Sequence, residues 1–188
     1  MKDNLIDISG VGIVFIVIAS AAVYAPLCRR IRGFCFDDIE LFAAIAGANG
    51  KGFRWWWYAG QRRLLWVTYR LSWYFCGRRP QGWLLGNMAL HIVNALVLLQ
   101  LAEFFGLSHG GAVTAALALM IHPKAVMAVA TVSGRSSLLC STLWLLGLLA
   151  AVHGQVLWTT GLGASSLLVK EEGILFPVML MGVALVCR

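Results

Sequence analysis

Residues 83–105 read WLLGNMALHIVNALVLLQLAEFF, and this apolar run decides the fold class. A helix needs about 20 such residues to cross the hydrocarbon of a bilayer. Within the run, Asn87, His91 and Asn94 are spaced four and three residues apart, so on a helix they share a face with Trp83. Polar side chains at membrane depth face protein or water rather than lipid. The run therefore predicts a membrane helix with a polar stripe turned toward other helices.

Two roles are open for this polar stripe. Hydrogen bonds between polar side chains hold membrane helices together, and that role needs no ligand. The alternative is that Asn87, His91 and Asn94 face a substrate. The residues alone do not separate the two roles.

The composition of the whole chain agrees with a membrane environment. Of its 188 residues, 60% are hydrophobic and 12% are charged, and the mean hydropathy is +0.81. Soluble domains usually carry roughly 25% charged residues. We therefore expect an integral membrane protein, with residues 1–188 forming a single module.

A first apolar run covers residues 11–27 and carries no charge. It has the length of a secretory signal peptide, but it ends in Pro26-Leu27-Cys28-Arg29-Arg30 rather than in a small-residue cleavage site. We interpret it as a retained signal-anchor helix and the first membrane helix.

Further apolar runs fill the remaining membrane segment, residues 83–187. After the second span they lie at about 110–121, 137–153, 155–169 and 174–187. Several are shorter than the roughly 20 residues that cross a bilayer, so tilted or paired segments are expected. The sequence predicts an all-α, polytopic transmembrane helix bundle of five to six membrane helices.

Residues 28–80 form the long connection in this arrangement. Tryptophan and tyrosine favour the headgroup level of a bilayer, and arginine favours anionic phosphates there. Both residue types are abundant here, which predicts amphipathic interfacial helices at roughly 36–48 and 60–76. An ordinary aromatic belt around the bundle is the alternative. The aromatic residues are Trp55, Trp56, Trp57, Tyr58, Trp66, Tyr69, Trp73, Tyr74 and Phe75.

Two adjacent carboxylates, Asp37 and Asp38, lie in this otherwise basic connection. Residues 29–79 hold ten of the chain's 15 lysines and arginines, and Glu40 is the one other acid. An aromatic belt does not explain an acidic pair, so Asp37 and Asp38 are the best candidates for chemistry.

Three polar corners between the later apolar runs are further candidates. They are His122-Pro123-Lys124, Ser133-Gly134-Arg135-Ser136-Ser137 and Lys170-Glu171-Glu172-Gly173. Proline and glycine break helices, which frees backbone donors beside a guanidinium. Each corner taken alone also fits a solvated loop end. The five cysteines show no zinc-like spacing, and apolar packing is their expected role.

The order of these motifs resembles the GT-C superfamily of membrane glycosyltransferases, in particular the tetratricopeptide-associated O-mannosyltransferases and bacterial enzymes that use polyprenyl-phosphate sugars. The matching motifs are Asp37-Asp38, Arg62 to Tyr74, Trp83 to Leu96, His122-Pro123, Val132 to Ser136 and Val169 to Gly173. They cover nearly the whole chain.

The resemblance implies a polyprenyl-phosphate-sugar-dependent glycosyltransferase whose acceptor is a protein, glycan or lipid. Asp37 or Asp38 would be the general base that takes the proton of the acceptor hydroxyl. Arg135, with His122 and Lys170, would stabilise the departing lipid phosphate. The expected substrate-binding set is Arg135, His122, Lys170, Glu171, Asn87, His91 and Asn94.

The resemblance implies no certain cofactor for this reaction. The acidic pair offers oxygen ligands for Mg or Mn, as in some members of the superfamily, but two or three carboxylates alone are a weak metal signature. We therefore expect no dedicated metal ligands and keep a divalent cation as the alternative.

Departures from the family pattern support a different function. Relatives usually carry an acid where this chain has Met127 and another where it has Ser137, and full enzymes of the class are longer than 188 residues. A catalytically silent accessory subunit, in a complex whose partner supplies the C-terminal half, is the alternative. A lipid-linked-sugar flippase is a third interpretation, but it leaves the acidic pair unexplained.

The predicted location is a plasma or inner membrane, in a multi-pass arrangement. The resemblance puts the 28–80 loop on the non-cytoplasmic side, whereas Arg29, Arg30 and Arg32 favour the cytoplasmic side by the positive-inside rule. We follow the resemblance. The net charge of +7 is explained by anionic lipid rather than by nucleic acid.

Overall fold

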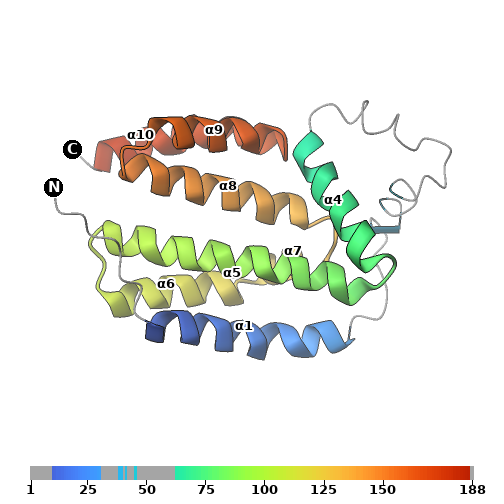
Figure 1. Cartoon of the computed structure of the whole chain (residues 1–188). Coiled ribbons are helices and arrows are strands. Elements are labelled where there is room, and N and C mark those ends of the chain that lie inside the picture. Colours follow the sequence, from blue (N-terminus) through green and yellow to red (C-terminus); the bar gives the residue numbers. More distant parts are fainter. Residues whose placement is uncertain (1–9, 31–37, 40, 42–44, 46–61, 187–188) are drawn as a thin grey trace.

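The computed structural model describes residues 10–30, 38, 39, 41, 45 and 62–186, and the regular elements within these ranges are helices. Figure 1 shows most of them as a stack of roughly parallel rods, with α4 inclined at one end. The bounds are α1 Gly10–Arg30, α4 Arg63–Cys76, α5 Pro80–Phe104, α6 His109–Ile121, α7 Pro123–Ala130, α8 Arg135–Val152, α9 Val156–Leu167, the 3₁₀ helix η1 Glu171–Leu175 and α10 Phe176–Val186. The all-α prediction is confirmed for the described residues.

Helix α5 lies at the centre of the bundle, between α1 and α6 on one side and α8 on the other (Figure 1). It begins at Pro80, where a missing N–H costs nothing because the first helical donors have no partner within the helix. It ends before Gly106, whose φ of 87° is the left-handed conformation that favours glycine. The N–H of Leu107 then donates to the carbonyl of Ala102 at 3.0 Å and closes the end of the helix.

Helices α6 and α7 are two parts of one broken segment. They meet at an angle of 53° across His122. Pro123 stands at the first position of α7, and its ring removes the N–H that a continuous helix would need. Pro123 follows the apolar run expected at 110–121, and α7 lies outside the predicted runs.

Three apolar clusters hold the helices together. The first lies between α1, α5 and α6 and includes Ile16, Leu99 and Met120. The second joins α4 to α5 and α8 through residues such as Tyr69 and Trp83. In the third, Phe176 of α10 packs against α5 and α8. This cluster consists of Val97, Leu101, Leu148 and Phe176. The second cluster fixes α4 against the end of the bundle where the polar side chains described below gather.

The lengths of the helices decide which can cross a membrane. Among the helices in the described ranges, α5 and α8 are long and apolar enough, and the bent pair α6 and α7 gives a third if it counts as one span. The apolar part of α1, Gly12–Leu27, is shorter, as are α9 with 12 residues and α10 with 11. Two to three such helices indicate a membrane protein. They are fewer than the five to six membrane helices that the sequence predicts.

The long connection contains one described helix. Its bounds, Arg63–Cys76, agree with the predicted helix at about 60–76. Of the helix predicted at 36–48, residues 38, 39, 41 and 45 are described, and the others lie outside the described residues.

Candidate functional site

The carboxylate of Asp38 contacts the corner that precedes α8. It accepts hydrogen bonds from the backbone N–H groups of Val132 at 3.2 Å and Ser133 at 3.0 Å, and the Asp38 residue is 2% exposed. Gly134 follows at a point where a Cβ would overlap the backbone of Ala128. The acidic motif and the Ser-Gly-Arg motif therefore meet, although 94 to 95 positions of sequence separate them.

Arg135 begins α8 and is buried at 3% exposure. Its Nε donates to Asn87 Oδ1 at 2.8 Å, one Nη donates to the Thr68 carbonyl at 3.3 Å and to Ser72 Oγ, and the other Nη donates to the Trp83 carbonyl at 3.1 Å. These bonds use four of the five N–H groups that a guanidinium carries. Arg135 thus ties α8 to α4 and α5.

Aromatic rings complete the surroundings of this guanidinium. Its central carbon lies 5.2 Å from the ring centre of Trp83 and 5.7 Å from that of Tyr69, within the range of cation–π attraction. The Tyr69 hydroxyl donates to the carbonyl of Val132 at 3.3 Å. Burial raises the pKa of the Tyr69 phenol, and the positive charge of Arg135 opposes that rise. Tyr69 is therefore a neutral donor at physiological pH.

Asn87 links the Arg135 side chain to the corner. Its Oδ1 accepts from Arg135, while its Nδ2 donates to the carbonyls of Thr131 at 2.7 Å and Val129 at 3.3 Å. Both ends of the amide are thus used within the protein. This geometry gives Asn87 the bridging role that was one of the two open interpretations of the polar stripe.

The other two members of the stripe lie deeper in the bundle. Asn94 donates from Nδ2 to the carbonyl of Leu138 at 3.1 Å, and His91 packs edge-on against Tyr24 with ring centres 5.8 Å apart. Both are buried, and within the described residues His91 Nε2 and Asn94 Oδ1 have no hydrogen-bond partner. Neither residue reaches the surface in this arrangement, so the stripe faces protein along its length.

The Lys170 corner touches the start of α8 from the other side. Lys170 is half-buried, and its Nζ donates to Ser137 Oγ at 3.1 Å and pairs with Glu172 at 2.6 Å. Glu171 forms a two-oxygen ion pair with Arg62, with a shortest distance of 2.7 Å. Hydrogen bonding by the backbone of Glu171, followed by the Arg62 side chain, lowers the pKa of Glu171.

The structure brings some of the predicted site residues together and leaves others apart. Asp38, Asn87 and Arg135 belong to one hydrogen-bonded cluster around residues 131–135, and Lys170 lies beside it at Ser137. His122 is exposed at the bend between α6 and α7. Asp37 lies outside the described residues, and so does Glu40. In the described ranges, no three histidine, cysteine or acidic side chains form a group that could hold a metal ion.

Residues of α4 that were not among the predicted site residues complete the cluster. Thr68 supplies a backbone carbonyl and Ser72 a hydroxyl to Arg135, and Tyr69 covers the guanidinium. A signal was present, since Thr68 and Ser72 stand four residues apart and share one face of a helix. The many aromatic residues led instead to the prediction that this helix lies on a lipid surface.

Comparison with known proteins leaves the family unassigned. No family model matches this chain, and no curated protein or solved structure matches it either.

Proposed function

We propose that this protein is a GT-C-type membrane glycosyltransferase that uses a polyprenyl-phosphate sugar. The observation that carries the proposal is the meeting of three motifs at one end of the bundle. Asp38 holds the backbone before Arg135, and Arg135 in turn holds Asn87. Motifs scattered over about a hundred residues need no shared location in a purely structural bundle, whereas a catalytic site requires one.

The two aspartates then take different roles in this proposal. Asp38 is buried and accepts two backbone hydrogen bonds, so an acceptor hydroxyl does not reach it in this arrangement. A general base must lie within hydrogen-bond reach of the proton that it takes. We therefore assign the base to Asp37 and make Asp38 the residue that positions the loop.

The reaction is a nucleophilic substitution at the anomeric carbon. The acceptor oxygen forms a bond to that carbon as Asp37 takes its proton, and the bond between the carbon and the phosphate oxygen breaks. The polyprenyl phosphate leaves with the electron pair. A nearby cation stabilises the charge that develops on this leaving group.

Lys170 is the first candidate for that cation. Arg135 would have to leave its acceptors on Asn87, Ser72 and Trp83 to reach a lipid phosphate. Lys170 is half-buried beside the same corner and makes two polar contacts. In this scheme Arg135 keeps the site assembled, and His122, which is exposed at the α6–α7 bend, is a more distant candidate.

The membrane arrangement is part of the same proposal. Helices α1, α9 and α10 would enter the bilayer beside α5, α8 and the bent α6–α7 pair, giving five to six membrane segments. The 28–80 loop would then lie on the non-cytoplasmic side. Labelling of Cys35 and Cys76 with a membrane-impermeant thiol reagent in sealed vesicles tests the side. Labelling that occurs only after the cytoplasmic face is made accessible to the reagent would contradict the non-cytoplasmic position of the loop.

One observation favours a second candidate, a catalytically silent accessory subunit. Ser137 stands where an acid is usual, and it accepts a hydrogen bond from Lys170 while Glu172 supplies the charge partner. Asp38 and Arg135 are likewise engaged within the protein. Such a cluster keeps the fold without turnover, and this candidate predicts a larger partner that co-purifies in fixed ratio.

A transfer assay separates the two candidates. Purified protein is supplied with a polyprenyl-phosphate sugar and acceptors of the protein, glycan and lipid classes, with and without Mg²⁺ or Mn²⁺. Transfer by the wild type that is abolished in Asp37→Asn, while the thermal unfolding midpoint of that variant stays unchanged, supports the enzyme. Wild-type transfer that survives Asp37→Asn contradicts the assigned base. Absence of transfer together with a stoichiometric partner supports the accessory subunit.

A further inference from the structure

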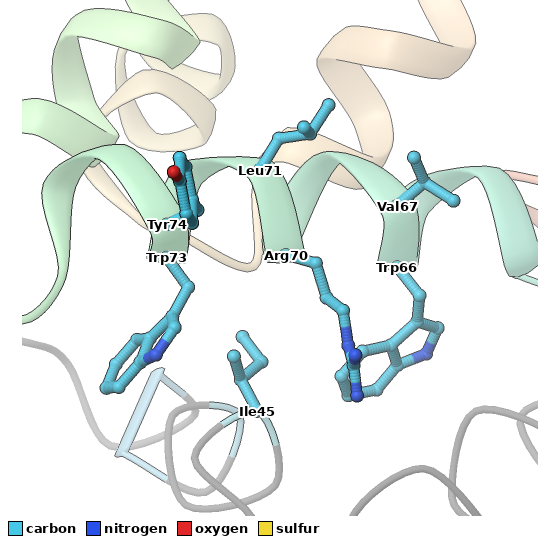
Figure 2. A pocket seen from close by; sticks show the side chains of 7 residues that line it. All are labelled: Ile45, Trp66, Val67, Arg70, Leu71, Trp73 and Tyr74. Atoms are coloured by element: carbon cyan, nitrogen blue, oxygen red, sulfur yellow. The ribbon is translucent and has the colours of Figure 1, made fainter.

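A groove with a volume of about 560 Å³ lies along the outward face of α4. Six of its lining residues belong to this helix, and Ile45 of the preceding connection forms the other wall. Figure 2 shows Trp66, Arg70 and Trp73 extending from α4 toward the side on which Ile45 lies. Among the described residues, the lining consists of Ile45, Trp66, Val67, Arg70, Leu71, Trp73 and Tyr74.

The chemistry of the lining is that of an amphipathic ligand. Six of the seven side chains are aromatic or aliphatic, and Arg70 is the one charged side chain among them. At helical spacing Arg70 falls in the middle of the face, with Trp66 one turn before it and Tyr74 one turn after it. A chain of methylene groups fits such walls, and the guanidinium favours a phosphate between them.

Several of these side chains are exposed within the described structure. Val67 is 44% exposed, Leu71 54% and Tyr74 82%, and the Arg70 side chain is also exposed. The opposite face of the helix, with Leu65 and Tyr69, is buried against the bundle. Helix α4 therefore has an outward apolar face that is exposed within the described part of the chain.

The positive charge around the groove favours an anionic ligand. Residues 62–79 contain five arginines and no acid. Arg62 pairs with Glu171 from outside this segment, and the five arginines of the segment outnumber that one acid. A positive segment beside a bilayer attracts anionic lipid, by about 1 kcal/mol for each cation near the surface.

The length of α4 agrees with a position along a membrane surface. Its 14 residues extend roughly 20 Å at 1.5 Å per residue, well below the thickness of the hydrocarbon, which is about 30 Å. Tryptophan and tyrosine rings prefer the headgroup level, where a ring has both an apolar and a polar neighbour. A lipid seated in the groove would thus have its phosphate and its chain at the depths found in a bilayer.

We propose that this groove is a binding site for one anionic phospholipid of the surrounding membrane. Arg70 binds the phosphate, and an acyl chain lies along Val67, Leu71 and Tyr74. The site is independent of the proposed glycosyl transfer, since it needs neither Asp37 nor the lipid-linked sugar. Its expected effect is to fix α4 at the bilayer surface.

The test uses the full chain in detergent, titrated with phospholipids that carry brominated acyl chains. Bromine quenches tryptophan fluorescence at short range, and Trp66 and Trp73 line the groove. Brominated phosphatidylglycerol should quench the wild type at lower concentration than brominated phosphatidylcholine does. In Arg70→Gln the apparent affinity for phosphatidylglycerol should fall about fivefold, the loss expected for one surface cation, while that for phosphatidylcholine stays unchanged.

Two variants make the result specific. Arg79→Gln removes the same charge from the same segment but lies outside the groove, and it should retain the wild-type preference. Tyr74→Ala, at an exposed position, should weaken quenching by both lipids. Equal losses in Arg70→Gln and Arg79→Gln would show general surface attraction and overturn the site. So would an Arg70→Gln variant that keeps the wild-type preference.

Discussion

The carboxylate of Asp38 accepts a hydrogen bond from the backbone N–H of Ser133 at 3.0 Å, across 95 positions of sequence. This bond and its neighbour at Val132 join the first long connection to the corner from which α8 starts. The same corner holds Arg135, whose guanidinium reaches α4 and α5. Asp38 is therefore one of the residues that hold the parts of this cluster together.

Asp38→Ala should therefore destabilise the protein. The substitution leaves the N–H groups of Val132 and Ser133 without their acceptor, and a buried donor without a partner costs about 1–3 kcal/mol. The thermal unfolding midpoint in detergent should fall. Ile39→Ala, at an adjacent and exposed position, is the matched control and should stay close to the wild type. Equal midpoints for Asp38→Ala and wild type would contradict the bridging role.

Arg135→Lys should also destabilise the protein, although the charge is kept. A lysine carries a compact ammonium group and cannot span the acceptors on Asn87, Ser72 and Trp83 from one position. We expect a loss on the order of 2–4 kcal/mol, because buried acceptors lose their donors and a charge stays buried.

Arg78→Lys is the control for the arginine substitution, since Arg78 is exposed in the turn after α4. Its unfolding midpoint should match that of the wild type. An Arg135→Lys variant with the same unfolding midpoint as Arg78→Lys would show that the hydrogen bonds of Arg135 contribute little to stability.

Much of the helical layout could be predicted from hydrophobic patterning alone. The runs expected at 110–121 and 137–153 correspond to α6 His109–Ile121 and α8 Arg135–Val152. Apolar length and charged corners encode such segments locally. Helix α7 was missed because Pro123 both ends one helix and starts the next, and only the second role depends on the residues that follow.

The candidate site could be predicted only in part. The residue types of Asp38, Asn87 and Arg135 carried a signal, but their contacts join segments about 45 to 95 residues apart. No local periodicity encodes such pairings, which depend on how the helices pack. The spacing of Thr68 and Ser72 indicates a shared helix face but not its partner, and Thr68 acts through its backbone carbonyl, which every residue possesses.

Gly163→Ala should weaken the packing of α10 against the bundle. A Cβ at Gly163 would overlap the ring of Phe176, and one at Gly147 would come within 2.6 Å of the same ring. Phe176 is 3% exposed, so the ring has little room to move. Overpacking of this kind typically costs about 1–3 kcal/mol.

Gly161→Ala is the control in the same helix, because nothing lies within 4 Å of a Cβ there. Alanine has a higher helix propensity than glycine, so this variant should be as stable as the wild type or more stable by up to about 1 kcal/mol. Thermal unfolding in detergent compares the two. A Gly163→Ala variant as stable as Gly161→Ala would contradict the tight contact with Phe176.

The Arg62–Glu171 ion pair should make a small, pH-dependent contribution to stability. The pKa of Glu171 is lowered in the folded chain, so its ionised form is favoured by folding. A group of this kind stabilises the protein above its unfolded pKa, and the contribution is lost as the pH falls through the lower, folded value. The unfolding midpoints of wild type and Glu171→Gln should therefore differ at pH 7 and converge as the pH falls below the ordinary value of 4.5. A difference that grows on acidification would contradict this sign.

Tyr24→Phe should weaken the attachment of α1 to the end of α6. The Tyr24 hydroxyl donates to the carbonyl of Met120 at 2.8 Å, and Tyr24 is fully buried. Carbonyls in the last turn of a helix lack a partner within the helix, and α6 ends at Ile121, one residue after Met120. Loss of this hydroxyl should cost about 0.5–1.5 kcal/mol, measured as a lower midpoint of thermal unfolding in detergent. Tyr74→Phe removes the same hydroxyl from a residue that is 82% exposed and should have no such effect. If the two variants unfold at the same temperature, the hydrogen bond of Tyr24 contributes little to holding α1 against α6.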